Sequence, residues 1–311
     1  MAGEPVKAKF DILGLGAVAV DDLIYVTGYP PADTKTHVLR TERQCGGLTA
    51  IALIAATRLG SKCAYAGVLG EDEFSQFAIA QMQNEGVDLK HLQRRQDARP
   101  VHSFIVVDSQ TGTRNIFCDL SGVVGAGKDW PKESVIRAAR VLFVDHIGLA
   151  GMIRAAKIAR QSGIPVVADL ERESGPTFPT LLGLVDHLIV SQGFAKKLTR
   201  QGNPARAAKA LWTEQRKVVV VTCGEKGCWY LHDNETKAKH LPAFKVSAVD
   251  TTGCGDVFHG AYAAGLAEKK TVEECVRFAS AAAALKATNS GAQNGIPTRG
   301  LVEKFLADRS E

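Results

Sequence analysis

The hydrophobic pattern of the chain alternates between short apolar runs and longer segments with helical spacing. Runs of strand length lie at 10–16, 141–144, 165–168, 188–190 and 217–222, and helical segments lie at 74–85, 133–140, 152–161 and 205–211. Such alternation predicts a parallel sheet with helices on both faces, which is a doubly wound, mostly parallel α/β fold. No repeat and no long linker divides the pattern, so we predict one domain over residues 1–311.

A second, smaller sheet is predicted near the N-terminus. Strand-like pieces at 23–29 and 37–42 are joined by a segment rich in turn-forming residues, beginning at Pro30. A hairpin at 102–118, around Ser109-Gln-Thr-Gly112, is a further candidate for the same sheet. We expect residues 22–43 to form a small β lid over the larger sheet.

Composition excludes several classes of protein. The chain has 311 residues, of which 45% are hydrophobic, and its net charge of +5 comes from 38 basic and 33 acidic residues. Basic residues occur at most in pairs, so nucleic acid is not an expected partner. Seven scattered cysteines without a Cys-x-x-Cys pair predict reduced thiols. Without a leader-like start or a membrane-length apolar stretch, we expect a cytoplasmic protein that does not bind membranes.

One loop carries the most specific chemistry. Residues 250–255 are turn formers and small residues, and the apolar run 257–266 follows, so a helix is expected to begin near Asp256. Gly253 and Gly255 allow the backbone amides to face one concavity, which together with a helix N-terminus forms an anion site. The carboxylate of Asp256 beside such a site predicts a general base, with a simple helix-capping role as the alternative.

This segment, Asp250-Thr-Thr-Gly-Cys-Gly-Asp256, resembles the D-T-x-G-A-G-D signature of the ribokinase-like carbohydrate kinases, the PfkB family. The resemblance extends from Phe10 to about Leu306. It implies a ribokinase-like fold and ATP-dependent phosphorylation of a sugar hydroxymethyl group, with Mg²⁺ on the ATP phosphates. It also implies that Asp256 is the catalytic base and that the backbone of Gly253, Cys254 and Gly255 is the anion hole. Cys254 replaces the usual Ala, which changes little because the backbone amide carries the function.

Two further parts of the chain carry the implied sugar site. Cys45 to Gly60 resembles the family's G-G-x-x-x-N-x-A-x-x-x-x-R-L-G signature, which assigns Gly46 and Gly47 to the substrate, although Ile51 replaces the Asn. A diglycine that only starts a helix is the alternative. Asp21 matches the acidic residue that binds sugar hydroxyls.

Lys35 bears on whether the sugar is neutral or acidic. This lysine matches one in the family's sulfo-sugar kinases, which resemble the chain closely, but Asp145-His-Ile147 stands where those enzymes have a basic residue. A single lysine on a mobile lid would bind an exposed acid weakly. We therefore expect a neutral sugar.

The implied nucleotide site lies on other segments. Lys217 to Gly227 resembles the family's T-x-G-x-x-G element, which assigns Thr222, Gly224 and Gly227 to ATP, with an ordinary strand end as the alternative. Asn289 begins the 289–297 loop, which in the family closes over adenine. Ser191 and Phe194 replace the family's N-x-x-E pair, so the metal ligands are not assigned. Several members bind K⁺ between this loop and the stretch after the Asp250 equivalent, and the resemblance leaves such an ion open.

Two other features of the sequence allow a different functional interpretation. Gly14 to Ala19 matches the G-x-G-x-x-A dinucleotide pattern, but a strand-like segment follows where a crossover helix is required. His259 is expected to be a packed, hydrogen-bonded residue.

A nucleoside kinase of the same fold and a sugar-binding regulatory protein are the rival functions. An unburied apolar lid face containing Leu23, Tyr25 and Val38 predicts a homodimer through the lid.

Overall fold

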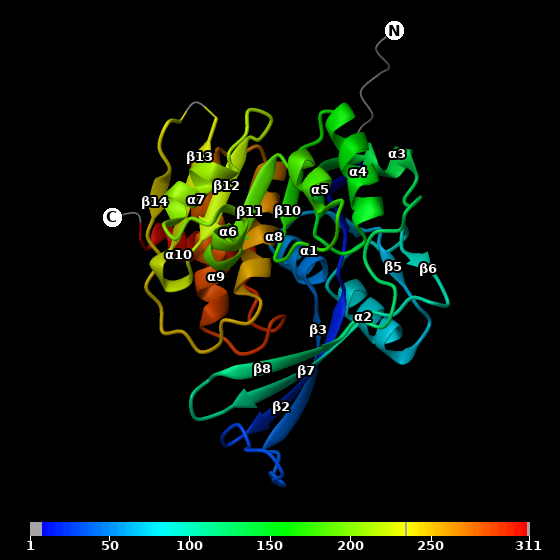
Figure 1. Ribbon diagram of the computed structural model, residues 1–311, viewed down its shortest axis with the longest axis vertical. Coiled ribbons are helices and arrows are strands. Elements are labelled where there is room, and N and C mark those ends of the chain that lie inside the picture. Colours follow the sequence, from blue (N-terminus) through cyan, green and yellow to red (C-terminus); the bar gives the residue numbers. More distant parts are fainter. Residues whose placement is uncertain (1–7, 234, 310–311) are drawn as a thin grey trace.

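The computed structural model describes residues 8–233 and 235–309 and is built around an eight-stranded sheet (Figure 1). The strand order is β14-β13-β12-β11-β10-β9-β1-β4. The six strands from β4 to β12 in this order run parallel. Strand β13 pairs antiparallel with β12, and the edge strand β14 pairs antiparallel with β13. The strands are β1 (Phe10–Leu15), β4 (Cys63–Tyr65), β9 (Ala139–Val144), β10 (Val166–Asp169), β11 (His187–Ser191), β12 (Val218–Thr222), β13 (Cys228–His232) and β14 (Lys239–Leu241).

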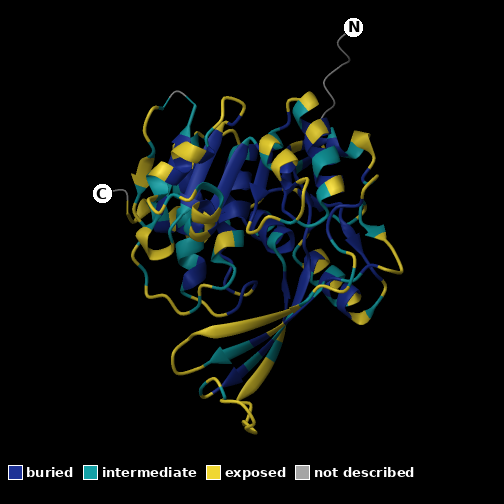
Figure 2. Cartoon of the chain, in the orientation of Figure 1, coloured by how far each residue is buried: buried dark blue, intermediate teal, exposed yellow. Residues whose placement is uncertain are grey.

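The central strands are buried on both faces, as their composition requires. The four valines of β12 have 0% exposure, and Figure 2 shows the neighbouring strands equally buried. One hydrophobic core joins one face of the sheet to α1, α2, α8, α9 and α10. The other core joins the opposite face to α4, α5, α6 and α7. This confirms the predicted doubly wound α/β fold.

The helices differ from the sequence prediction mainly at their ends. Helix α3 has only four residues, because the chain from Ala139 onward pairs with β1 as strand β9. The helices are α1 (Leu48–Arg58), α2 (Glu73–Asn84), α3 (Glu133–Ile136), α4 (Leu149–Gln161), α5 (Phe178–Leu184), α6 (Gln192–Thr199), α7 (Pro204–Leu211), α8 (Cys254–Ala267), α9 (Val272–Ala287) and α10 (Arg299–Ala307), with a short 3₁₀ turn η1 (Gly224–Lys226). No helix in the described ranges is both long enough and apolar enough to cross a bilayer.

The lid is a separate four-stranded sheet of order β3-β2-β7-β8 that projects from the main body (Figure 1). Its strands are β2 (Ala19–Val26), β3 (Arg40–Gly46), β7 (Val101–Asp108) and β8 (Arg114–Asp119), so the 102–118 hairpin belongs to it. Strand β2 follows β1 after only three residues, which is why the dinucleotide pattern at 14–19 lacks its crossover helix. A two-stranded sheet of β5 (Val68–Leu69) and β6 (Gln93–Arg94) completes the fold.

Candidate active site

The candidate site lies at the carboxyl edge of the parallel sheet. Asp145 follows β9, and Asp169, Ser191 and Thr222 are the last residues of β10, β11 and β12. Because these strands are parallel, their carboxyl ends lie along one edge. In doubly wound sheets this edge is where ligands bind.

Helix α8 begins at this edge with an open N-terminus. Gly253 precedes it in a left-handed conformation with φ of 77°, and no side chain caps the helix. The helix starts at Cys254, two residues earlier than the sequence predicts. The Gly255 amide has no acceptor among the described residues, and a Cβ on Gly255 would meet no atom within 4 Å. The Cys254 amide donates to the Thr251 carbonyl at 3.2 Å, and the Asp256 amide bonds its own carboxylate. The free Gly255 amide and the open space beside it form a site with the chemistry to hold an anion.

Asp256 lies half-buried in the first turn of α8, close to a buried histidine and a second aspartate. The Nδ1 atom of His259 is 2.8 Å from the carbonyl oxygen of Gly255 and 3.2 Å from Oδ2 of Asp169. Its Nε2 atom is 3.1 Å from the carbonyl oxygen of Ile189. His259 is therefore a buried, hydrogen-bonded residue, as expected, and it joins α8 to β10 and β11.

The site has a strongly negative environment. Burial raises the pKa of Asp256 well above its usual range, and the charges of Asp169, Glu171 and Asp21 raise it further. Burial likewise raises the pKa of Asp169, with contributions from Glu171 and Asp145. Like charges held together in this way favour protonation of the carboxyl groups unless a cation is present. The negative electrostatic potential of these carboxyl groups favours a ligand that carries a divalent cation and disfavours a free anion.

Asp145 has a structural role at the same edge. Its carboxylate accepts hydrogen bonds from the Ala17 amide at 2.6 Å, the Thr49 hydroxyl at 2.8 Å and the Ile147 amide at 2.8 Å. Burial still raises the pKa of Asp145 to about 6. These bonds fix the end of β1 to α1 and to the loop after β9, and they leave little capacity for a ligand.

A guanidinium also reaches this part of the site. Arg172, from the loop after β10, donates its Nε–H to Nε2 of His146 at 3.0 Å. His146 is therefore the acceptor, and burial together with the Arg172 charge lowers the pKa of His146 to about 4. The segment 145–147 contains no cationic side chain, as its sequence indicates, but an arginine from the next loop contacts it.

The predicted sugar residues Asp21, Gly46 and Gly47 lie together where the lid joins the main body. Asp21 pairs with Gln44 in the register of β2 and β3, and a Cβ on Gly46 would lie 2.1 Å from Oδ2 of Asp21. Gly47 has φ of 96°, and a Cβ there would lie 2.7 Å from the Ala17 carbonyl oxygen. The backbone therefore requires glycine at 47, whereas a side chain at 46 would displace the Asp21 carboxylate. Burial raises the pKa of Asp21 to about 6.

Lys35 is not close to those residues. It lies exposed in the β2–β3 loop, at the end of the strand pair opposite to Gly46. At about 3.3 Å per residue, the length of β2 alone puts roughly 20 Å between the two ends. The structure therefore does not bring Lys35 together with Asp21 and Asp256.

The predicted nucleotide residues lie beyond the carboxyl end of β12. Thr222 is half-buried, and Gly224 is exposed with φ of 57° and open space where a Cβ would be. Gly227 has φ of 85°, and a Cβ there would lie 2.0 Å from the Leu241 carbonyl oxygen, so the β12–β13 turn requires it. Asn289 is exposed and donates to the Thr288 hydroxyl at 3.1 Å.

The two residues that replace the family's N-x-x-E pair have structural roles. The Ser191 hydroxyl accepts from the Phe194 amide at 3.2 Å and so caps α6. Phe194 is buried against Phe178, with ring centroids 6.1 Å apart. Within the described ranges, no group of three or more His, Cys, Asp or Glu side chains could enclose a metal.

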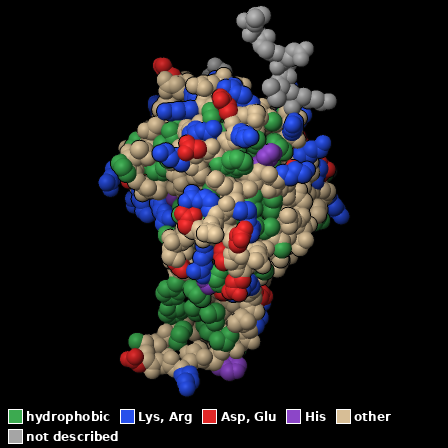
Figure 3. Space-filling view, turned by 90° about the vertical axis from the view of Figure 1, so that its right-hand side faces the viewer, with side chains coloured by type: hydrophobic (Ala, Val, Ile, Leu, Met, Phe, Trp, Pro, Cys, Tyr) green, Lys and Arg blue, Asp and Glu red, His purple; other side chains and the backbone are tan. Residues whose placement is uncertain are grey.

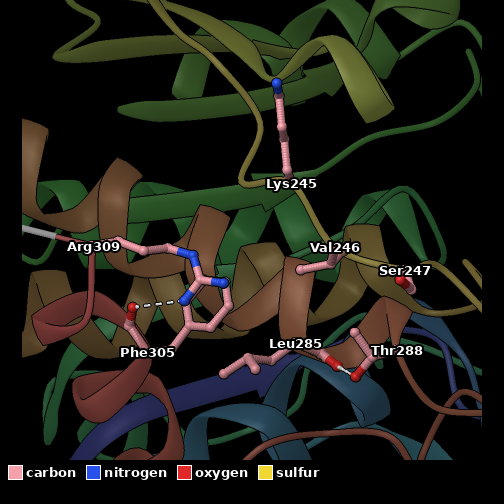
Figure 4. A pocket seen from close by; sticks show the side chains of 7 residues that line it. All are labelled: Lys245, Val246, Ser247, Leu285, Thr288, Phe305 and Arg309. Atoms are coloured by element: carbon pink, nitrogen blue, oxygen red, sulfur yellow. Dashed lines mark hydrogen bonds between the residues drawn. The ribbon is translucent and has the colours of Figure 1, made fainter.

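A pocket of about 590 Å³ lies near the end of α9, between the 245–247 segment and α10 (Figure 4). It is lined by Lys245, Val246, Ser247, Leu285, Thr288, Phe305 and Arg309. The guanidinium of Arg309 lies 3.8 Å from the centre of the Phe305 ring, and the Thr288 hydroxyl is bonded to the Leu285 carbonyl. None of the predicted site residues lines this pocket, so it is separate from the α8 N-terminus.

Sequence reasoning missed Asp169 and Lys286 as residues that shape the site. Asp169 is the first polar residue after the apolar run of β10, a position that signals the carboxyl edge of a buried strand. Lys286 interrupts the small-residue helix α9 and has 0% exposure. A lone lysine within such a helix was the available signal.

Comparisons with known proteins agree with this geometry. Residues 15–299 match the model of the pfkB family carbohydrate kinases. The chain is 29% identical to a ribokinase of Haemophilus influenzae, covering 94% of this chain and 97% of that one. It is 27% identical to fructokinase-1 of Oryza sativa subsp. japonica, covering 95% and 97%.

Solved structures give the same result. A ribokinase from Thermotoga maritima superposes with a TM-score of 0.82 at 27% identity, covering 96% of this chain and 99% of that one. An Arabidopsis thaliana ribokinase complexed with ribose and ATP gives a TM-score of 0.82 at 26% identity, covering 96% and 98%. With the family model matched across nearly the whole chain, the protein belongs to the pfkB family of carbohydrate kinases and is a sugar kinase.

Proposed function

We propose that the protein transfers the γ-phosphoryl group of ATP to a hydroxymethyl group of a neutral monosaccharide. The observation that carries the proposal is the open N-terminus of α8, where the unpaired Gly255 amide and the carboxylate of Asp256 lie in one helical turn. In this proposal the backbone of Gly253, Cys254 and Gly255 stabilises the charge of the moving phosphoryl group. Asp256 accepts the proton of the attacking hydroxyl.

Asp21, Gly46 and Gly47 are the proposed sugar-binding residues. Their support is their position at the base of the lid, where Asp21 is close enough to contribute to the negative potential at Asp256. The carboxylate of Asp21 accepts hydrogen bonds from hydroxyl groups, as the family resemblance implies. The glycines leave the backbone free of side chains at the same place.

Thr222, Gly224, Gly227 and Asn289 are the proposed ATP-binding residues, and Mg²⁺ is the proposed metal. The Arabidopsis ribokinase binds ATP together with ribose, which supports the nucleotide assignment. The donor set fits Mg²⁺, because this ion uses one or two carboxylates together with phosphates and water, and the carboxylates of Asp169 and Glu171 add to the potential at Asp256. When bound, Mg²⁺ would neutralise phosphate charge.

The negative potential supports a neutral substrate over an acidic one. Asp21, Asp169, Glu171 and Asp256 all act on the same region, and a substrate acid would be repelled by them. Lys35 is too far along the lid to offset that repulsion in this conformation. Arg172 is a cation near this edge that could attract an acidic substrate, so the substrate test includes an acidic sugar.

A homodimer through the lid is the proposed assembly, but by a different set of residues from those predicted. Leu23 and Tyr25 are buried with Ile105, and the Arg40 guanidinium covers the Tyr25 ring at 3.6 Å. The prediction that Leu23 and Tyr25 form the unburied face is therefore wrong, whereas Val38 is exposed, as predicted, although it lies outside the strands. Within the lid strands the exposed apolar residues include Phe104, Ile116 and Phe117, and Figure 3 shows hydrophobic side chains gathered on the lid.

An ADP-release assay over a panel of substrates tests the proposal. The panel contains neutral ketoses and aldoses, a sugar acid, a sulfo-sugar and purine and pyrimidine nucleosides, each with Mg-ATP. We expect turnover with at least one neutral sugar and little with the acids. Preferred turnover of a nucleoside would support the rival nucleoside kinase, and sugar binding without turnover would support the regulatory protein.

A further inference from the structure

Lys286 is a fully buried lysine that the proposed reaction does not use. It lies in the last turn of α9 with 0% exposure. Its ammonium group donates to the carbonyl oxygen of Asp250 at 2.8 Å and to that of Asn289 at 3.3 Å. No carboxylate among the described residues forms an ion pair with it. A buried charge is costly without partners, so these two backbone contacts require an explanation.

The carbonyls that hold Lys286 belong to the two loops that border the anion site. Asp250 begins the 250–256 segment that ends at the catalytic carboxylate. The Asp250 carboxylate accepts from the Thr252 amide and from the Gly291 amide, both at 2.8 Å. The Val249 and Asp250 amides both donate to the Ala287 carbonyl, at 2.7 and 3.1 Å. The 250–256 segment is therefore fastened to the end of α9 and to the loop that follows it.

Backbone carbonyls that face one another around a single positive charge are the ligands of a monovalent cation. The Lys286 nitrogen carries that charge at this place, and the side chain fills the space beside the two carbonyls. Burial lowers the pKa of Lys286, and the charge of Arg114 on the lid acts in the same direction, while Cys254, Asp250 and Asp256 act in the opposite direction. An ion entering here would have to displace the ammonium group.

We propose that the Lys286 ammonium is a built-in monovalent cation that holds the 250–256 segment to the 289–297 loop, so that the kinase needs no added K⁺. Lys286 is on this account a positioning residue, which acts through the Asp250 carbonyl on the amides of Gly253 to Gly255. A tethered ammonium also saves the entropy of capturing an ion from solution. The inference rests on the proposed function for its turnover test, and a second readout is independent of turnover.

The first test uses the full-length wild-type protein with Mg-ATP and the best substrate from the panel. ADP release is measured with tetramethylammonium as the sole monovalent cation and again in K⁺ or NH₄⁺, at equal ionic strength. We expect the same kcat in all three salts. An increase in kcat of about tenfold or more in K⁺ would overturn the proposal.

The second test removes the built-in charge. Lys286→Ala should lower kcat about 10- to 100-fold in tetramethylammonium, because the anion hole loses its alignment, with little change in KM. K⁺, NH₄⁺ or methylammonium should restore part of the loss. Lys286→Met fills the same space without a charge and should not be rescued, and Lys304→Ala, at an exposed lysine of α10, is the matched control. Full activity of Lys286→Ala in tetramethylammonium would contradict the proposal.

A third test does not depend on turnover. The melting temperature of Lys286→Ala should rise when K⁺ replaces tetramethylammonium, and that of the wild-type protein should not, because only the variant has a vacant cation site. The opposite result, a K⁺-dependent rise in the wild type alone, contradicts the inference. If Lys286→Ala does not fold, the wild-type series and Lys286→Met decide. A protein that phosphorylates no sugar but shows this pattern would count against the proposed substrate and not against Lys286.

Discussion

Helix α8 and the lid support opposite sides of the candidate site in different ways. From Val257 to Gly265, α8 is buried throughout, and it packs so tightly on α1 that a Cβ on Gly260 would lie 2.2 Å from the Ala52 carbonyl oxygen. The lid has a small core of Leu23, Tyr25 and Ile105 and leaves Phe104 and Phe117 exposed at 44% and 52%. The side that we propose to be catalytic is thus tightly packed, and the side that we propose to bind the sugar is held by few contacts.

This contrast predicts that substitutions at α8 act mainly on turnover, while substitutions in the lid act mainly on substrate affinity and assembly. A hydrogen bond also links the lid to the loop beside α8. The side-chain oxygen of Gln44, on lid strand β3, accepts from the Ala292 amide at 3.0 Å in the loop that Lys286 helps to hold. The lid is therefore connected to the catalytic side through a neutral hydrogen bond of modest strength.

The largest expected effect is that of Asp256→Asn. Loss of a general base should lower kcat about 10²- to 10⁴-fold, while ATP affinity measured by calorimetry stays near normal. Because the pKa of Asp256 is raised in the folded protein, its ionised form is disfavoured there, and the neutral amide should keep or raise the melting temperature at neutral pH. A kcat close to that of the wild type would rule out Asp256 as the base.

The next largest loss of activity is expected at Gly255, which has open space beside it, in contrast to the tightly packed Gly47. Gly255→Val should reduce phosphoryl transfer about 10²-fold or more, by filling the space beside the amides, and should melt near the wild-type temperature. Gly47→Val is the comparison, because its positive φ and its contact with Ala17 predict a much lower melting temperature. If Gly255→Val melts as early as Gly47→Val, the loop is structural and the anion-hole assignment has no support.

A smaller effect concerns pH. The base must be ionised to act, so kcat/KM should fall on the acid side as Asp256 gains its proton. The charge of Asp169 raises the pKa of Asp256, and Asp169→Asn should therefore move this decline to lower pH. An unchanged pH profile in this variant would show that the two carboxyl groups are not coupled during turnover.

The fold was largely readable from the sequence, because buried strands such as β12 and the glycine-initiated helix α8 have local signals. Strands β13 and β14 and the exact ends of the lid strands could not be predicted from the sequence, because they depend on which strands pair with one another. Asp169 lies near Asp256 only because β10 lies beneath α8, and strand order is not encoded locally. Lys286 reaches a carbonyl 36 residues earlier in the chain, a contact that helix spacing does not reveal.

The exposed apolar residues of the lid are the proposed dimer interface. Phe117→Asp places a charge among the exposed apolar residues of the lid and should shift the protein to monomers in solution scattering, with an effect on KM and little on the melting temperature. Asn115→Asp, on the same strand, is the control for added charge. A wild-type protein that is monomeric at working concentration would contradict the lid dimer.

The smallest effect is expected at Lys35. Lys35→Ala should change KM by no more than about fivefold, since an exposed ion pair contributes about 0 to 1 kcal/mol. Arg172→Ala gives the comparison with the cation that lies nearer to the carboxyl edge. A rise in KM of about a hundredfold for Lys35→Ala would overturn the preference for a neutral sugar.

The most direct test of the central claim is to identify the products by phosphorus NMR during turnover. Wild-type protein with Mg-ATP and its preferred sugar should form one phosphate monoester on a hydroxymethyl carbon for each ADP released. The Asp256→Asn variant should form neither product at a comparable rate. ADP accompanied by free phosphate, or equal ester formation by both proteins, would contradict phosphoryl transfer to a sugar hydroxyl activated by Asp256.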